Sequence, residues 1–592
     1  MDLNIILSQY IQEAFIEIYQ TDIYTPVLQP THKEYDGTYT LVTYPYLKIS
    51  KTSPENTGKA IGEYLLKKED VVKTFNVVKG FLNIELTDHA WLTCFNDLPD
   101  TFVDQDRKNE EWMVEFSSPN TNKPLHLGHL RNNFLGYSVA RILAAIGSKI
   151  HKVQIINDRG IQICKSMVAW KRYGKGESPE SSQLKGDKLV GRYYVRFDEE
   201  YKREVNELLQ QGKNKEDAKK EAPILVEAQE MLRQWEKRAP EVMALWEQMN
   251  SWVYEGFEQT YATMGVFFDK LYYESQTYKL GKEEVLKGVK EGIFFQKEDG
   301  SVWVDLTDEG LDEKLLLRAD GTSVYMTQDI GTAIQRFRDF PGIKGQIYTV
   351  GNEQDYHFKV LFLILKKLGF SWASQCFHLS YGMVDLPSGK MKSREGTVVD
   401  ADDLMEEMFT TAERQTRELG KIEGLTTAQA EELYKILGLG ALKYFLLTVD
   451  PKKRMLFDPG ESIQFQGNTG PFIQYTHARI CAILRRADEL EIDYRSHVSE
   501  ELGLSDTERT GIYYLSIQKE KVMEAARSFS PAIIAHHVYD MAREYNHFYA
   551  ELPIFNEKDE ELRQFRVAYS YRIAKAIDKG MGLLGINVPE RM

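Results

Sequence analysis

The sequence predicts a multidomain protein with a small α+β module, a central α/β domain built on a parallel sheet, and an all-helical C-terminal domain. Two observations predict this fold. A strand pattern, a loop, a long helical pattern and a second strand pattern follow one another within residues 112–160, which is the spacing of a βαβ unit. From about residue 400 the apolar residues recur at helical spacing almost to the end. The expected domain boundaries are 1–108, 109–402 and 403–592.

The N-terminal module begins with residues 2–19, whose apolar spacing predicts an amphipathic helix rather than a secretory signal. Alternating stretches at 39–50 and 75–86 predict strands. The polar stretch 104–112 is typical of a linker. A separate α+β module ending near residue 108 is therefore expected.

The central domain contains a long interruption. Residues 171–250 are highly charged with a helical pattern, and such a charge run is typical of a solvated helical face. We expect an inserted helical region at about 165–310. Strand and helix patterns resume at 346–369, and a strand-like stretch at 375–386 leads into a glycine-bearing loop at 387–397.

The overall charge argues at first against a nucleic-acid partner. The 592 residues include 74 Lys+Arg and 89 Asp+Glu, a formal net charge of −15. The excess is uneven, because residues 451–592 carry 19 basic and 21 acidic side chains, whereas residues 1–450 carry 55 and 68. A nucleic acid would have to dock on local basic faces, with an affinity that falls as salt rises.

Composition also indicates the compartment. With 42% hydrophobic residues the chain can form large packed cores. The spacing of the four cysteines fits neither a zinc site nor a disulfide framework, and no apolar run approaches the roughly 18 residues of a membrane span. The four cysteines are Cys94, Cys164, Cys376 and Cys481. Together these observations predict a cytoplasmic protein.

The sharpest motif is His126-Leu127-Gly128-His129, at the start of the long helical pattern. A helix N-terminus presents free N–H groups and the positive end of the helix dipole, so it attracts phosphate. Two imidazoles can donate to phosphate oxygens, and Gly128 leaves room for an adenine or a ribose. The motif therefore predicts a nucleotide site.

A second motif is the basic loop Lys390–Thr397. Lys390, Lys392 and Arg394 place three cations within five residues on a glycine-flanked loop, which suits a triphosphate. Alone, such a loop is more often a basic surface loop. Its position after the later strands of the same α/β region favours a functional role.

Together the two motifs resemble the HIGH and KMSKS signatures of class I aminoacyl-tRNA synthetases. Further stretches resemble the arginyl-tRNA synthetases in particular: 80–86, 117–136, 318–331, 457–480 and 583–592. The resemblance covers essentially the whole chain. It implies a Rossmann-like catalytic domain, a C-terminal anticodon-binding bundle, and the joining of L-arginine to tRNA(Arg) through an arginyl-adenylate.

The arginine site follows partly from side-chain chemistry. Tyr325 and Asp329 lie four residues apart, so on a helix they share one face, and a carboxylate is the best partner for a guanidinium. The resemblance assigns both to the arginine side chain and adds Asn120 and Gln354. Such a site could reject other amino acids without editing, so region 171–250 is predicted not to be an editing module.

For ATP, the resemblance implies binding by His126, Gly128, His129, His357 and Met391. The cofactor expectation is ATP as substrate with Mg²⁺ and no tightly bound protein metal. Catalysis is assigned to His126, His129 and the loop residues Lys390, Lys392 and Arg394.

One departure from the family pattern stands out. The loop has the sequence K-M-K-S-R, so Ser393 replaces the second lysine of KMSKS. Lys123 lies three residues before His126, and the family often carries a lysine at this position. We hypothesise that Lys123 supplies the missing charge.

Several residues are candidates for tRNA contact. Arg572, Lys575 and Lys579 line one helical face, and Tyr545 belongs to an aromatic stripe that is either an RNA-stacking surface or packed core. Two further residues, Phe81 and Asn83, resemble those with which the family's N-terminal domain reads the tRNA elbow. The resemblance also implies that adenylate formation requires tRNA and that the chain is a monomer.

Three alternatives remain at this point. A class I synthetase for another amino acid is opposed by Tyr325, Asp329 and Gln354. A nucleotidyltransferase of the HxGH type is opposed by the long helical C-terminal domain. A non-catalytic RNA-binding relative is opposed by the intact histidine pair, although Ser393 keeps it open.

Overall fold

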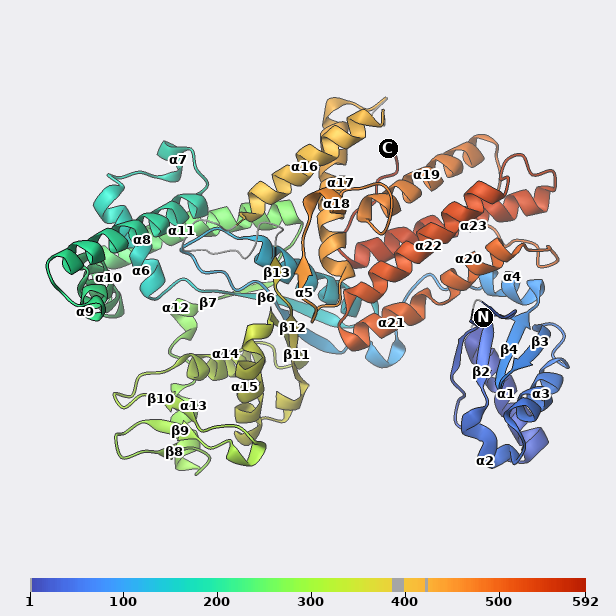
Figure 1. The fold of residues 1–592 in the computed structure, drawn as a ribbon, viewed down its shortest axis with the longest axis horizontal. Coiled ribbons are helices and arrows are strands. Elements are labelled where there is room, and N and C mark those ends of the chain that lie inside the picture. Colours follow the sequence, from blue (N-terminus) through green and yellow to red (C-terminus); the bar gives the residue numbers. More distant parts are fainter. Residues whose placement is uncertain (1–2, 33, 386–398, 421–423) are drawn as a thin grey trace.

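The computed structural model describes residues 3–32, 34–385, 399–420 and 424–592. Figure 1 shows how the parts of the chain are arranged. The N-terminal module lies beside the C-terminal helices, and the helical insertion lies at the opposite end of the molecule. Within the described ranges, no helix is both long and apolar enough to cross a bilayer.

The N-terminal module is a four-stranded antiparallel sheet of order β1-β2-β4-β3 with four α-helices and one short 3-10 helix. Its elements are α1 (Leu3–Tyr19), β1 (Leu28–Pro30), β2 (Tyr39–Val42), η1 (Tyr44–Tyr46), α2 (Leu47–Ser50), α3 (Pro54–Leu65), β3 (Val72–Val78), β4 (Phe81–Leu86) and α4 (Asp88–Asn96).

Two strand predictions in this module need correction. Only the first four residues of 39–50 form a strand, because the chain turns at Pro45 into η1 and α2. The stretch 75–86 is a hairpin instead of one strand. Lys79 and Gly80 both have positive φ, 49° and 77°, as a tight two-residue hairpin turn requires.

The central sheet is five-stranded and parallel, with order β12-β11-β5-β6-β7. The predicted βαβ unit is confirmed, and its helix ends just before Gly147, whose φ is +105°. Its elements are β5 (Glu111–Glu115), α5 (Leu127–Ala145), β6 (Lys149–Ile156), β7 (Lys270–Tyr273), α14 (Tyr325–Asp339), β11 (Ile343–Gly351), η4 (Asn352–Gln354), α15 (Asp355–Lys367), η5 (Ser371–Gln375) and β12 (Cys376–Tyr381).

The strand order places the ligand crevice. From β5 the chain adds β6 and β7 on one side, and β11 and β12 lie on the other. In open parallel sheets ligands bind beyond the carboxyl ends of the strands where the order reverses. The loop that follows β5 and leads into α5 lies at this point.

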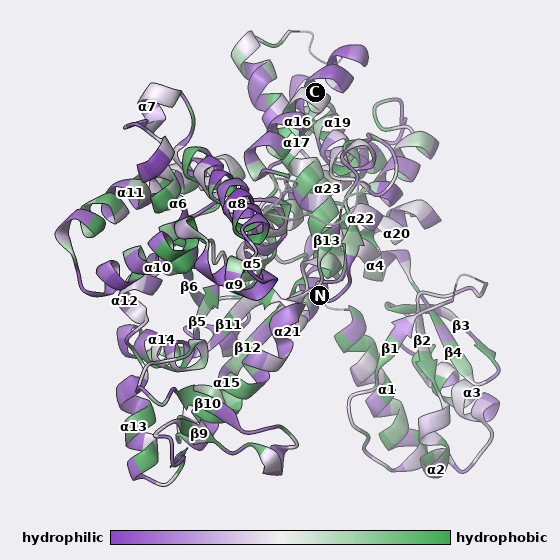
Figure 2. Cartoon of the chain, turned by 60° about the vertical axis from the view of Figure 1, so that its left-hand side comes forward, coloured by the Kyte–Doolittle hydropathy of each residue, from purple (hydrophilic) through white to green (hydrophobic). Residues whose placement is uncertain are grey.

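The insertion between β6 and β7 is helical, and Figure 2 shows its helices with mixed hydrophilic and hydrophobic residues, as expected for amphipathic helices packed on one another. Its elements are α6 (Ile161–Tyr173), α7 (Pro179–Ser182), α8 (Gly186–Gln210), α9 (Lys215–Glu221), α10 (Pro223–Glu236) and α11 (Pro240–Met264).

The predicted limits of the insertion, about 165–310, are wrong at the C-terminal side. That range contains β7 of the central sheet and most of a small antiparallel sheet of order β10-β9-β8. These strands have two to four residues, too few to show an alternating pattern. The elements are α12 (Glu274–Thr277), α13 (Lys282–Lys290), β8 (Phe295–Gln296), β9 (Val302–Val304), η3 (Thr307–Glu309) and β10 (Lys314–Leu317).

The C-terminal domain is helical apart from a short strand pair. Its elements, with the partner strand β13 (Val384–Asp385), are α16 (Ala401–Glu418), α17 (Thr427–Thr448), β14 (Met455–Leu456), α18 (Pro459–Ser462), α19 (Gly470–Glu489), α20 (Asp506–Ser516), α21 (Gln518–Ser528), α22 (Pro531–Glu551) and α23 (Glu560–Leu583).

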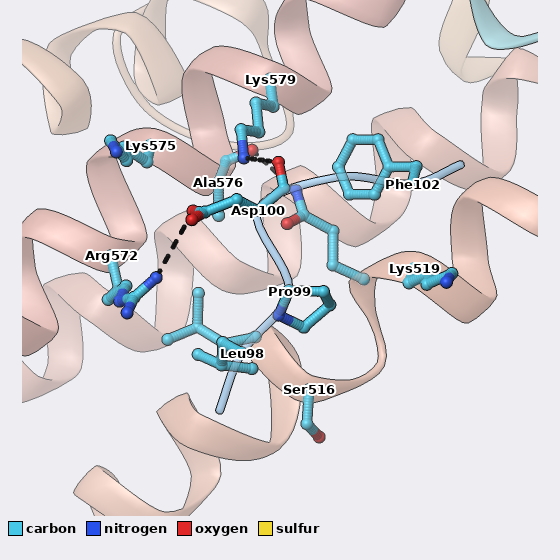
Figure 3. A pocket seen from close by; sticks show the side chains of 12 residues that line it. Leu98, Pro99, Asp100, Phe102, Ser516, Lys519, Arg572, Lys575, Ala576 and Lys579 are labelled. Atoms are coloured by element: carbon cyan, nitrogen blue, oxygen red, sulfur yellow. Dashed lines mark hydrogen bonds and ion pairs between the residues drawn. The ribbon is translucent and has the colours of Figure 1, made fainter. Parts of the chain in front are cut away.

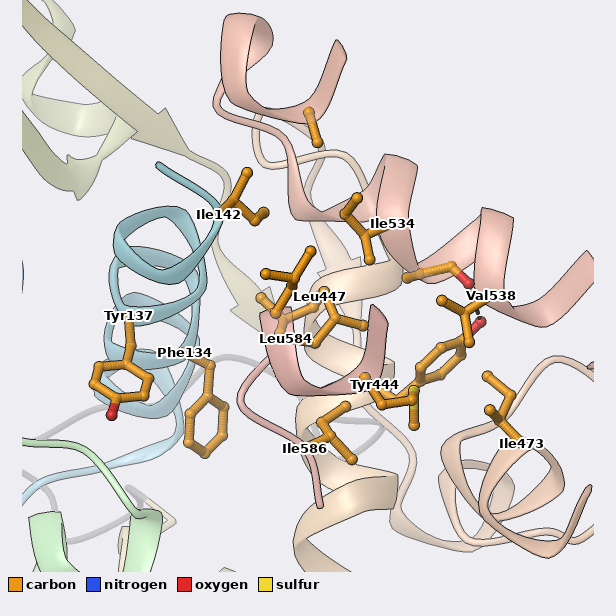
Figure 4. Packing of buried hydrophobic residues seen from close by; sticks show 14 of the residues in the cluster. Phe134, Tyr137, Ile142, Tyr444, Leu447, Ile473, Ile534, Val538, Leu584 and Ile586 are labelled. Atoms are coloured by element: carbon orange, nitrogen blue, oxygen red, sulfur yellow. Dashed lines mark hydrogen bonds between the residues drawn. The ribbon is translucent and has the colours of Figure 1, made fainter. Parts of the chain in front are cut away.

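Helix α5 is shared between the catalytic and C-terminal domains. Figure 4 shows Phe134 and Ile142 of α5 facing a cluster that includes Leu447 and Leu584, all at most 2% exposed. The Ser138 hydroxyl adds a buried hydrogen bond of 2.9 Å to the Leu583 carbonyl. The helix that begins at the HxGH motif is therefore part of the C-terminal core.

The N-terminal module docks on the C-terminal domain through α4 (Figure 1). The Arg509 guanidinium donates to the Asp88 carboxylate at 2.7 Å, and the Asn96 amide donates to the Val498 carbonyl at 3.1 Å. Phe95 meets Phe565 edge-on. These contacts connect the two parts of the chain that are expected to meet tRNA.

Candidate active site

The two histidines of the HxGH motif cap α5 reciprocally. His126 Nδ1 accepts from the Gly128 amide, and His129 Nδ1 accepts from the His126 amide, both at 3.1 Å. Because both Nδ1 atoms act as acceptors, each neutral ring carries its proton on Nε2. Each ring therefore retains one N–H donor at a helix N-terminus.

Burial keeps both imidazoles neutral. It lowers the pKa of His126 to about 3, with the nearby Lys123 charge adding to the effect, and it lowers the pKa of His129 well below its usual range. The rings lie 4.0 Å apart between centroids. The pair can thus donate hydrogen bonds across the physiological pH range without changing charge.

The chain directly after residue 398 pairs with the motif. The Leu127 amide donates to the Val399 carbonyl at 3.3 Å, and the Ala401 amide donates to the Leu125 carbonyl at 2.9 Å. His126 and Asp400 form the backbone bridge between these bonds. The four predicted residues of the second motif, Lys390, Met391, Lys392 and Arg394, lie outside the described residues.

Lys123 borders the same cavity as His126. The cavity has a volume of about 240 Å³, and its other lining residues include Arg192, Tyr194 and Asp400. Burial lowers the pKa of Lys123. The structure therefore places the proposed substitute cation beside the start of α5, where phosphate binding is predicted.

The predicted arginine residues lie at the same carboxyl edge of the sheet. Tyr325 and Asp329 are in the first turns of α14, and Gln354 ends η4 after β11. Tyr325 is 77% exposed. Asn120 is exposed on the loop after β5, where it forms a backbone bridge with Asn157 after β6.

His357 was expected near ATP, and in the structure it contacts Asp329, a residue predicted to bind the arginine side chain. Its Nε2 lies 2.6 Å from Asp329 Oδ2, and the Asp329 side chain is 42% exposed. The half-exposed carboxylate is thus oriented by a histidine before any substrate binds.

Glu274 is a further acidic side chain at the carboxyl end of the sheet. It directly follows β7, and its Oε1 lies 3.7 Å from Arg159 Nη1. Burial raises the pKa of Glu274 to about 7, against the Arg159 guanidinium, and the charges of Asp158 and Asp329 raise it further. By contrast Glu115, at the end of β5, is buried and paired with Arg336 of α14.

The predicted tRNA residues fall into exposed and buried sets. Figure 3 shows Arg572 and Lys579 of α23 at the segment that joins α4 to the catalytic domain. Arg572 Nη1 lies 3.7 Å from the Asp100 carboxylate, and the Lys579 ammonium donates to the Asp100 carbonyl at 2.7 Å. Lys575 is exposed, and Phe81 is 37% exposed.

Tyr545 and Asn83 are in the buried set. Tyr545 is 0% exposed and its hydroxyl donates to Ser570 Oγ at 2.9 Å, so the packed-core interpretation of its stripe applies. Asn83 is 1% exposed; its oxygen accepts from Thr40 at 2.6 Å, and its amide donates to Asn76 at 2.7 Å. Neither side chain presents a surface to RNA in this structure.

Within the described residues, no group of three or more His, Cys, Asp or Glu side chains could hold a metal ion.

Comparison with known proteins identifies the family. The model of the catalytic domain of class I tRNA synthetases (R) matches residues 99–458, and that of the DALR anticodon binding domain matches residues 473–592. The arginine–tRNA ligase of Flavobacterium psychrophilum is 54% identical and aligns over 100% of both chains. That of Bacteroides fragilis strain ATCC 25285 is 56% identical over 95% of each.

A solved structure agrees on the fold. The arginyl-tRNA synthetase of Thermus thermophilus superposes with a TM-score of 0.78 at 23% identity, over 99% of each chain. The catalytic-domain model alone spans more than half of this chain, and the two relatives align over 100% and 95% of it. The chain therefore belongs to the class I arginyl-tRNA synthetase family.

Proposed function

We propose that the chain activates L-arginine with ATP and transfers it to the 3′-terminal adenosine of tRNA(Arg), releasing AMP and diphosphate. The observation that carries the proposal is the position of two half-sites at one sheet edge. The neutral pair His126 and His129 begins α5, and the Asp329 carboxylate lies near the start of α14. The first suits the phosphates of ATP and the second suits a guanidinium.

In the first step the arginine carboxylate attacks the α-phosphate of ATP, and the bond to pyrophosphate breaks. No side-chain nucleophile is required. The Nε2–H groups of His126 and His129 donate to phosphate oxygens, and Gly128 lets the nucleotide approach the backbone. Lys123 stabilises the charge that develops on pyrophosphate. Mg²⁺ enters as part of the ATP substrate.

Specificity is assigned to the carboxylates at the start of α14 and after β7. Asp329 pairs with the guanidinium, Tyr325 covers the aliphatic stem, and Glu274 adds a second negative charge close by. A neutral or shorter side chain would not bring a guanidinium to these carboxylates and would lose its charge-assisted hydrogen bonds. The roles of Asn120 and Gln354 are the α-amino acid end and a further arginine contact.

In the second step a ribose hydroxyl of the terminal adenosine, the 2′ position in class I enzymes, attacks the adenylate. Docking of the tRNA is assigned to Phe81 on the N-terminal module and to Arg572, Lys575 and Lys579 on α23. Both surfaces belong to parts that pack on one another through α4. We also propose a cytoplasmic monomer, as the resemblance to the family implies; light scattering tests the oligomeric state.

Membership of the family excludes two of the alternatives, a nucleotidyltransferase and a synthetase for another amino acid. The remaining alternative is a non-catalytic relative. Arginine-dependent ATP–pyrophosphate exchange, with and without tRNA(Arg), decides. Exchange that requires arginine and tRNA supports the proposal, and lysine in place of arginine is the control. A folded protein that shows no exchange under either condition would contradict it.

A further inference from the structure

The helical insertion contacts the C-terminal domain through a cluster of opposite charges. The first turn of α8 carries Lys188, whose ammonium lies 2.6 Å from an Asp403 carboxylate oxygen and 3.5 Å from one of Asp400. Lys185, the residue that precedes α8, contacts the carboxylate of Asp402. Lys188 and Asp403 are 215 residues apart in the sequence. Two distant helix starts are therefore joined by charge.

Contacts within the insertion hold Lys185 and the start of α8 in place. Lys185 lies between Asp402 and the fully buried Asp187, whose carboxylate is 3.3 Å from the ammonium. The Lys185 ammonium also donates to the Thr260 hydroxyl of α11. The backbones of α8 and α11 are in close contact, since a side chain on Gly186 would collide with the Trp252 carbonyl. The Lys185 side chain is 15% exposed, so its pairs differ from typical surface ion pairs, which contribute little, whereas Asp403, the partner of Lys188, is 71% exposed.

The aspartates at the other end connect to His126. Asp400 caps α16, with its Oδ1 accepting from the amides of Asp402 and Asp403 at 2.8 and 3.3 Å. The backbone of Asp400 forms an isolated antiparallel β-bridge with the backbone of His126. A path of direct contacts therefore runs from Lys188 to Asp400 and on to the histidine that caps α5.

We propose that Lys185 and Lys188 form with Asp400, Asp402 and Asp403 an interdomain latch, by which the helical insertion positions residues 399–401 against His126. The latch residues are positioning residues for the phosphate half-site. This inference rests on the proposed function for its kinetic readout and gives the insertion a role other than editing. The arginine half-site on α14 and α15 has no contact with the latch among the interactions described above.

The kinetic test separates turnover from arginine binding. Misplacing a catalytic group by about 1 Å can lower the rate by roughly 10²-fold. Lys188→Glu should therefore lower kcat of ATP–pyrophosphate exchange about tenfold or more and change KM for arginine less than about twofold. Lys185→Met should act in the same direction. Arg203→Glu is the matched control, because Arg203 makes the same type of pair on α8 with Glu200 and Glu207 and does not reach α16.

A charge exchange tests the pairing itself. The double variant Lys188→Glu with Asp403→Lys restores a cation beside Asp400 and should recover most of the lost kcat, although each single variant is impaired. Unchanged kcat in both single lysine variants would overturn the latch, as would a loss that the exchange does not recover.

Hydrogen exchange gives a readout that does not depend on activity. The amides of Leu127 and Ala401 bond across the junction, so peptides containing them should exchange faster in Lys188→Glu and return to the wild-type rate in the double variant. Unaltered exchange in Lys188→Glu would refute the latch even in an inactive protein. An inactive wild type with the expected exchange pattern would refute only the proposed function.

Discussion

Asp329 and His357 form a 2.6 Å contact between Oδ2 and Nε2 that links the first turns of α14 and α15. The pair orients a carboxylate at the site where a guanidinium is proposed to bind, and the carboxylate is still half exposed. We therefore expect His357 to act on arginine through Asp329. The predicted contact of His357 with ATP stays a prediction beside this contact with Asp329.

Removing the carboxylate should abolish arginine activation. A bound guanidinium would cover the half-exposed Asp329 carboxylate, and truncating one partner of a charge pair that is desolvated in this way costs roughly 2–5 kcal/mol, so Asp329→Ala should lower kcat/KM for arginine by at least ~30-fold. ATP affinity should stay close to that of the wild type, because the histidine pair lies on α5. His357→Gln should raise KM for arginine several-fold. Exchange kinetics and ATP binding by calorimetry check both, and an equal loss of ATP affinity in Asp329→Ala would contradict the assignment.

Glu274 predicts a pH dependence of arginine binding. Its pKa is raised to about 7 by burial, so below that pH the carboxyl is neutral and attracts a guanidinium weakly. KM for arginine should therefore fall as pH rises from 6 to 8. In Glu274→Gln the same profile should be flat. The measurement is KM at several pH values with ATP saturating, and a wild-type profile without slope is the contrary result.

The histidine pair predicts loss of stability in acid. The pKa of folded His126, about 3, lies below the value of about 6.5 for an unfolded histidine, so the folded state binds fewer protons. The contribution of His126 is thus complete above pH 6.5 and is lost as pH falls from 6.5 towards 3. The melting temperature of His126→Asn, which keeps a capping side chain, should fall less than that of the wild type between pH 7 and 5. Parallel curves would show that His126 is not held neutral.

Lys123 predicts a loss of adenylate formation. Its ammonium borders the cavity beside His126, where no lysine of the K-M-K-S-R sequence occupies the fourth position. Lys123→Ala should lower kcat of exchange by roughly 10²-fold, as removal of a charge-stabilising donor commonly does. Lys175→Ala, on an exposed turn outside this cavity, is the control. Near-normal turnover of Lys123→Ala would exclude the role.

These residues show how much of the candidate site could be predicted from the sequence. His126 and the Tyr325–Asp329 face were predictable because capping and i, i+4 spacing are local properties of a helix. Glu274 was not, because it follows a four-residue strand that has no recognisable pattern. The burial of Asn83 and Tyr545 depends on which face of an element meets its neighbours, and that is decided by tertiary packing. The contact of Lys188 with Asp403 joins residues 215 positions apart, which no local pattern can indicate.

Removing the Asp100 carboxylate should affect tRNA binding in the opposite direction from removing the basic residues that Asp100 contacts. Arg572→Ala with Lys579→Ala should raise KM for tRNA and reduce its dependence on salt, because each phosphate contact contributes to the salt slope. Asp100→Asn removes the carboxylate 3.7 Å from Arg572 and should lower KM for tRNA, most clearly at low salt. In both variants KM for arginine should be unchanged at saturating tRNA. Aminoacylation at several potassium chloride concentrations measures the slopes. If Asp100→Asn and the double variant shift KM for tRNA in the same direction, the basic face of α23 contributes to folding instead of RNA binding, since only an electrostatic contact reverses its effect with the sign of the charge removed.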